Sequence, residues 1–81
     1  MLRIRILDIE VNQLMQADSV VRSALRQVGI KANVIQVAEH LEISRYGLMA
    51  SLPAVEINGR IVSTRQPVTR ELVFNLIQGC S

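Results

Sequence analysis

The residues of this 81-residue chain that could carry chemistry are few: one cysteine, one histidine, a close pair of carboxylates and scattered arginines. Cys80 is the only cysteine, so neither an internal disulfide nor a thiolate metal cluster can form from this sequence. It follows Gly79, and we expect an exposed thiol without a catalytic role. Redox sensing, a mixed disulfide or a disulfide-linked dimer is the chemistry that remains open to it.

His40 is the only histidine and has Glu39 and Glu42 as its acidic neighbours. A metal site needs ligands that converge on one point, whereas neighbouring positions of a helix project in different directions. We therefore assign His40 to a helix surface and predict neither a metal site nor a cofactor.

Asp8 and Glu10 follow the first apolar segment of the chain. Two carboxylates could support general acid–base catalysis if one of them were desolvated. No nucleophile or oxyanion donor accompanies them in the sequence, so we favour a structural role. Acidic side chains next to the N-terminus of the following helix would interact favourably with its dipole.

Composition excludes several classes of function. Apolar residues make up 49% of the chain, yet Tyr46 and Phe74 are its only aromatic residues, which leaves almost no stacking platform for single-stranded nucleic acid. The net charge is +2, and the basic residues form no run. No apolar stretch approaches the roughly 18 residues of a membrane span, and the first residues lack a signal-peptide pattern. We expect one cytoplasmic domain, residues 1–81, that binds neither nucleic acid nor membrane.

The elements that must position these residues follow from apolar periodicity and turn signals. Alternation predicts a strand over residues 2–7, and three- and four-residue spacing predicts a helix over residues 12–28, with Asn12 as N-cap and Gly29 after its end. A strand over 31–37 completes a βαβ unit with parallel strands. A short helix follows over 39–46, with Leu41 and Tyr46 as its inward candidates.

The second half of the chain predicts a hairpin and a final helix. Asn58-Gly59 separates strands over residues 53–57 and 60–64 and is the dipeptide that a tight hairpin turn requires. The last helix is predicted over 69–77, with Thr69 as N-cap and Val68 packed on Val73. The order βαβαββα predicts an α/β fold: a four-stranded mixed sheet with helices on both faces.

This order, with a proline opening the third strand, resembles the thioredoxin fold reduced to its core. The sequence of residues 46–63, YGLMASLPAVEINGRIVS, is similar to the corresponding segment of small thioredoxin/glutaredoxin-like redox proteins. The resemblance implies a cis bond before Pro53 and a redox Cys-x-x-Cys motif at the start of the first helix. Val11 and Leu14 occupy the positions of those cysteines, and Leu52 replaces a threonine before the proline.

Without cysteines at these two positions, the family's dithiol–disulfide exchange is excluded, because no thiolate is present at the start of the first helix to attack a disulfide. The resemblance then implies a degenerate member whose former active-site groove, formed by Val11, Leu14, Leu52 and Pro53, binds a protein or peptide partner. Arg45 and Arg65 could flank that groove and attract an anionic peptide or glutathione, although a solvated surface role is favoured. Two alternatives stay open: a thiol-dependent or glutathione-linked oxidoreductase using Cys80, and an obligate homodimer with a structural role.

Overall fold

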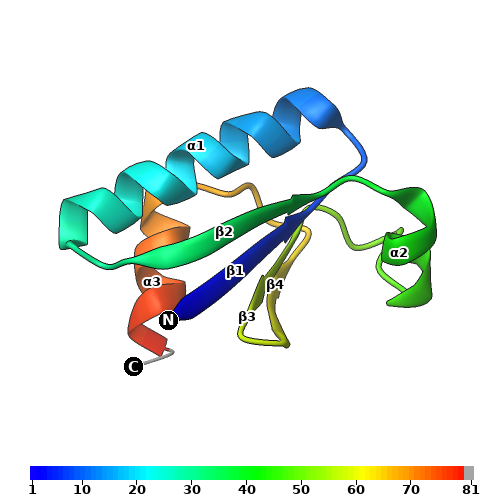
Figure 1. Cartoon of the computed structure of the whole chain (residues 1–81). Helices are drawn as coiled ribbons and strands as arrows, with labels where there is room; N and C mark the ends of the chain where they lie inside the picture. The colour runs from blue at the N-terminus through cyan, green and yellow to red at the C-terminus, as the bar shows by residue number, and fades with distance from the viewer. Residues whose placement is uncertain (80–81) are drawn as a thin grey trace.

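One mixed four-stranded sheet organises the molecule (Figure 1). The computed structural model describes residues 1–79. Its elements in chain order are β1 (Leu2–Leu7), α1 (Val11–Val28), β2 (Ala32–Val37), α2 (His40–Arg45), β3 (Ala54–Ile57), β4 (Arg60–Thr64) and α3 (Arg70–Gly79). The predicted order βαβαββα is therefore confirmed. Residue 80, and with it the expectation for Cys80, lies outside the described residues.

The strand order is β2-β1-β3-β4. β1 and β2 are parallel, as the long crossover through α1 requires, and β1 pairs antiparallel with β3. β3 and β4 form the predicted hairpin: Asn58 and Gly59 have positive φ angles of 51° and 87°, the backbone conformation of its turn. The Asn58 side chain also accepts a hydrogen bond from the Arg3 backbone N–H at 2.9 Å, which fixes the turn to the start of β1.

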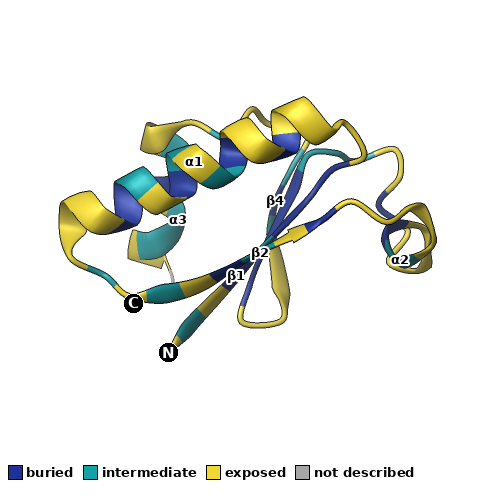
Figure 2. Ribbon diagram, turned by 45° about the horizontal axis from the view of Figure 1, so that its top comes forward, coloured by how far each residue is buried: buried dark blue, intermediate teal, exposed yellow. Residues whose placement is uncertain are grey.

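The larger core lies between one face of the sheet and the helices α1 and α3. Helix α1 turns a single buried stripe toward the sheet (Figure 2), and Gly29, with a φ of 71°, ends it in the left-handed conformation typical of a helix C-cap. Thr69 begins α3 as predicted, because its Oγ1 accepts a hydrogen bond from the Leu72 backbone N–H at 3.1 Å. The buried members of this core are Ile4, Ile6, Leu14, Ala17, Val21, Ala24, Leu25, Val34, Val55, Ile57 and Val73.

The opposite face of the sheet is covered at one end by α2 and the segment that follows it. The residue of α2 that enters this smaller core is Ile43, which is fully buried; the predicted inward residues Leu41 and Tyr46 are both exposed. The prediction failed because a helix of six residues is too short for its apolar periodicity to be read. The buried members of this core are Leu7, Val37, Ile43, Leu48 and Ala54.

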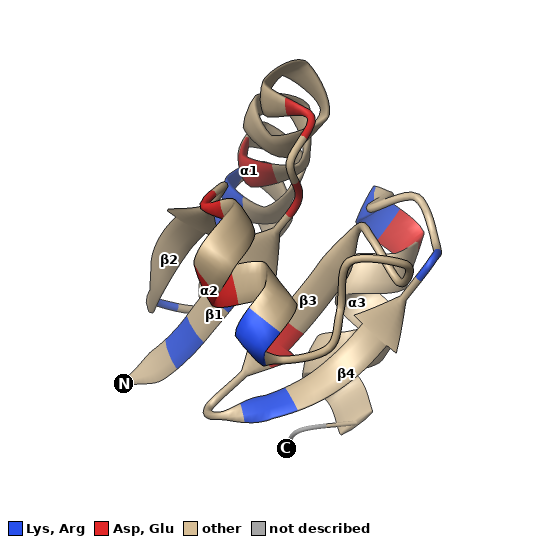
Figure 3. Cartoon of the chain, turned by 90° about the vertical axis from the view of Figure 1, so that its right-hand side faces the viewer, with Lys and Arg blue, Asp and Glu red and all other residues tan. Residues whose placement is uncertain are grey.

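Basic and acidic positions are interspersed along the backbone in Figure 3, and acidic positions occur near the starts of α1 and α2. Among the helices described over residues 1–79, none combines the length and apolar character needed to cross a membrane.

Candidate functional site

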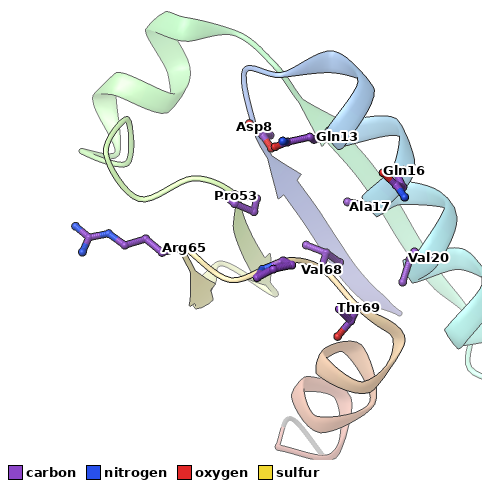
Figure 4. A pocket seen from close by; sticks show the side chains of 10 residues that line it. Asp8, Gln13, Gln16, Ala17, Val20, Pro53, Arg65, Val68 and Thr69 are labelled. Carbon is purple, nitrogen blue, oxygen red and sulfur yellow. The ribbon is translucent and has the colours of Figure 1, made fainter.

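A groove of about 480 Å³ opens between the first half of α1 and the loops that lead into β3 and α3 (Figure 4). Polar and apolar groups share its lining. The residues that form it are Asp8, Gln13, Gln16, Ala17, Val20, Pro53, Arg65, Pro67, Val68 and Thr69. The groove therefore joins three segments that lie far apart in the sequence.

The α1 wall is set by how this helix begins. Helix α1 starts at Val11, one residue earlier than predicted, and its N-cap is Glu10 rather than Asn12. The Glu10 carboxylate accepts a hydrogen bond from the Asn12 backbone N–H at 3.0 Å and so satisfies one of the unpaired donors of the first turn. Glu10 thus has the structural role at the helix N-terminus that the sequence favoured.

The opposite wall is the loop around Pro53, and the Leu52–Pro53 peptide bond is cis. Arg65, just after β4, holds this loop: its backbone N–H donates to the carbonyls of Ser51 and Pro53, each at 3.1 Å. Its side-chain Nε donates to the Ala50 carbonyl at 3.2 Å, and the guanidinium extends away from the groove in Figure 4. Arg65 therefore contributes its backbone to the groove and leaves the lining without an inward-pointing cation.

Asp8 lines the groove where β1 leads into α1. The residue is only 4% exposed, and its backbone N–H donates to the Val37 carbonyl at 3.1 Å, which ties it to the end of β2. One carboxylate oxygen, Oδ1, accepts from the Glu10 backbone N–H at 3.1 Å. The second oxygen, Oδ2, is buried and has no hydrogen-bond partner. A buried polar atom without a partner carries a desolvation cost, which makes Oδ2 the most unusual polar atom of the site.

Only one of the four predicted groove residues, Pro53, lines the observed groove. Leu14 is 2% exposed and belongs to the larger core, so it offers no surface to a partner. Leu52 is half-buried and packs against the smaller core, whereas Val11 is 56% exposed but outside the groove lining. The structure thus places Pro53 in a groove of mixed polarity and the other three residues outside its lining.

Helix geometry explains why Val11 and Leu14 lie outside the groove lining. Leu14 is on the buried stripe of α1, and a helix turns about 100° per residue, so Val11 and Gln13 lie on opposite flanks of that stripe. The flank that borders the groove carries Gln13, Gln16, Ala17 and Val20, which are spaced at i, i+3, i+4 and i+7. This spacing is present in the sequence and was the signal that sequence reasoning missed.

The remaining candidates lie elsewhere. His40 is exposed at the start of α2, and among the described residues no group of three or more His, Cys, Asp or Glu side chains could hold a metal. Arg45 is also on α2, where it is exposed, and it does not line the groove, so the alternative in which Arg45 and Arg65 both flank the groove finds no support.

A second polar cluster, not predicted from the sequence, surrounds Arg5 on the sheet face that carries α2. Its Nη1 donates to the Tyr46 hydroxyl at 3.0 Å and lies 3.4 Å from the Glu56 carboxylate, and its Nη2 pairs with Glu42. The Tyr46 hydroxyl, together with the Glu56 and Glu42 carboxylates, raises the pKa of Arg5 above its ordinary value despite partial burial. The cluster neutralises the buried Glu56 and attaches α2 to the sheet, so we assign it to stability.

The sheet order, the βαβαββα connectivity and a groove between the first helix and the proline loop define a thioredoxin-like domain. The chain belongs to the thioredoxin domain family, whose model matches residues 4–78. Among solved structures, the chain is similar to the germline-specific thioredoxin Deadhead (Thioredoxin-1) of Drosophila melanogaster, with a TM-score of 0.64 and 15% sequence identity. The similarity covers 99% of this chain and 81% of that one and shows the shared fold. The comparison with curated proteins finds no match.

Proposed function

We propose that this domain is a redox-inactive thioredoxin-like module that binds an extended segment of a partner protein in the groove beside Pro53. The observation that carries the proposal is a groove of about 480 Å³ at the start of α1, in a family domain whose sequence has no cysteine within residues 1–79. The helix start carries an exposed Val11 and a buried Leu14, neither of which can supply a thiolate. Binding is the function that such a groove can still perform.

The backbone next to the groove supports this mode of binding. The hydrogen bonds of the described residues leave the backbone N–H and C=O of Leu52 without a backbone partner. An extended peptide could pair with these groups as an added strand, while its side chains enter the groove beside Pro53. The apolar surfaces of Val20 and Val68 would bury part of such a side chain, and the Gln13 and Gln16 amides would supply hydrogen bonds.

The test is a selection of random twelve-residue peptides displayed on phage against the full chain, followed by titration of the enriched peptides. Gln16→Trp should fill the groove from an exposed position and weaken binding at least about tenfold, the loss expected when a contact area of this kind is blocked. Met15→Trp is the matched control, because Met15 is the exposed neighbour on the same helix and does not line the groove. It should leave binding unchanged.

Two results would contradict the proposal. One is a selection that enriches no peptide. The other is a set of enriched peptides that bind the Gln16→Trp variant as tightly as the original chain. Both variants change exposed residues of α1, so their unfolding curves should coincide and a difference in binding can be assigned to the groove.

A further inference from the structure

We infer that the groove selects a lysine side chain in the bound segment and that Asp8 Oδ2 is the acceptor for its ammonium group. This inference rests on the proposed function and adds the chemistry of the partner. Its starting observation is the Asp8 carboxylate in the groove lining, which is more than nine-tenths buried and keeps one oxygen without a hydrogen bond.

A ligand group at Oδ2 should be a hydrogen-bond donor, because this oxygen has no partner. It should also be positively charged, because the charged residues nearby in the sequence are acidic. Residues 6–21 contain three carboxylates, those of Asp8, Glu10 and Asp18, and no lysine or arginine. Asp18 is paired with Arg22 at 3.0 Å, whereas no cation contacts Asp8 or Glu10 among the described residues. The one arginine of the lining, Arg65, extends its guanidinium away from the groove (Figure 4). A positive group entering here would therefore meet uncompensated negative charge.

The geometry of Asp8 favours an ammonium over a guanidinium. A guanidinium binds a carboxylate best through two parallel hydrogen bonds that use both oxygens. Oδ1 already accepts from the Glu10 backbone N–H, whereas Oδ2 accepts no hydrogen bond, so Oδ2 is the first acceptor that a ligand would use. A lysine ammonium is a compact charge that needs only one such acceptor. Its aliphatic stem would lie against Ala17, Val20 and Val68, which line the path to Asp8.

Gln13 is a polar residue of the same groove lining as Asp8. In Figure 4 the Gln13 side chain points toward Asp8 from the first turns of α1, and Gln13 itself is exposed. No hydrogen bond joins the two side chains. Because Gln13 is exposed, its side chain can change rotamer without movement of the backbone, and its amide would lie beside the incoming ammonium.

The test uses two synthetic peptides, acetyl-Ser-Val-Lys-Val-Ser-amide and the same peptide with norleucine in place of lysine, titrated into the full chain labelled with ¹³C and ¹⁵N. Norleucine keeps an aliphatic stem and removes the charge. The lysine peptide should bind about tenfold more tightly, the preference expected of one charge-assisted hydrogen bond. Asp8→Asn should abolish the preference and leave the affinity for the norleucine peptide unchanged.

Glu10→Gln is the matched control, because it removes the neighbouring exposed carboxylate and keeps an oxygen to cap α1. The preference should survive in this variant; its loss there would show general attraction to acidic charge and overturn the inference. Should Asp8→Asn fail to fold, the ¹³Cγ resonance of Asp8 in the unsubstituted chain provides the readout, and it should move with the lysine peptide only.

Equal affinity for the two peptides, or no binding of the lysine peptide, also overturns the inference. The proposed function is judged separately by the phage selection. Enriched peptides without a basic residue that still lose affinity in Gln16→Trp would uphold the groove as a binding site and refute the role of Asp8.

Discussion

The position of Leu14 predicts a large loss of stability on truncation, in contrast to the binding role that the sequence suggested for it. The side chain is 2% exposed, between α1 and the sheet. Leu14→Ala removes three buried carbons, which at about 0.8 kcal/mol each gives about 2.4 kcal/mol of lost transfer free energy. The cavity left behind raises the expected loss to about 3 kcal/mol.

This loss is large for a small domain. A chain of this length has a free energy of unfolding on the order of 4–12 kcal/mol, so the substitution should remove a quarter or more of it. Urea unfolding followed by far-UV circular dichroism provides the measurement. With a slope of about 1.5 kcal/mol per molar urea, the midpoint should fall by about 2 M.

Val11→Ala is the control, because Val11 is 56% exposed and lies three residues earlier on the same helix. Its effect should stay within about 0.5 kcal/mol. A cost below about 1 kcal/mol for Leu14→Ala, or equal costs for the two variants, would refute the assignment of Leu14 to the core and restore it as a surface candidate.

Two further predictions concern residues that connect elements of the fold. Arg5→Ala should lower the free energy of unfolding by about 2 kcal/mol, because it leaves the buried Glu56 carboxylate without its cation. The double substitution Arg5→Met with Glu56→Leu should recover most of this loss. Chemical denaturation measures both variants, and an equal loss of stability in the double variant would contradict the assigned cause. Asn58→Ala should cost about 1 kcal/mol, because it removes the acceptor for the Arg3 N–H and disfavours the positive φ of the turn. Asn58→Gly restores only the backbone freedom and should fall between Asn58→Ala and the original chain in a thermal melt, unless the hydrogen bond contributes nothing.

Local signals in the sequence predicted the fold well where one residue type decides the backbone conformation. Asn58-Gly59 forms the hairpin turn, Gly29 caps α1, and Thr69 begins α3, each at the predicted position. The start of α1 was misplaced by one residue because two side chains could cap it, and Glu10 does so. Which of the two side chains caps the helix depends on the backbone conformation of the segment between β1 and α1. The sequence alone does not determine that conformation.

The site was predicted less well because it depends on packing between distant segments. Pro53 was placed correctly beside a groove, but the flank of α1 that faces it depends on how the helix rotates against the sheet. The spacing of Gln13, Gln16 and Val20 contained that information. The burial of Asp8 did not follow from any pattern, because it results from β2 and the start of α1 closing around the end of β1.

The two hydrogen bonds from the Arg65 N–H have a mechanical consequence for ligand selection. They join the Pro53 loop to the connection between β4 and α3. Two of the three segments that line the groove are therefore linked to each other and form one wall of it. The width of the groove then depends on the position of α1 relative to the sheet. Leu14 and Val21 are among the buried side chains on which that position depends. Substitutions that change side-chain volume beneath α1 would change the width of the groove and the size of the ligand that fits it. They would do so without altering any residue that a ligand contacts.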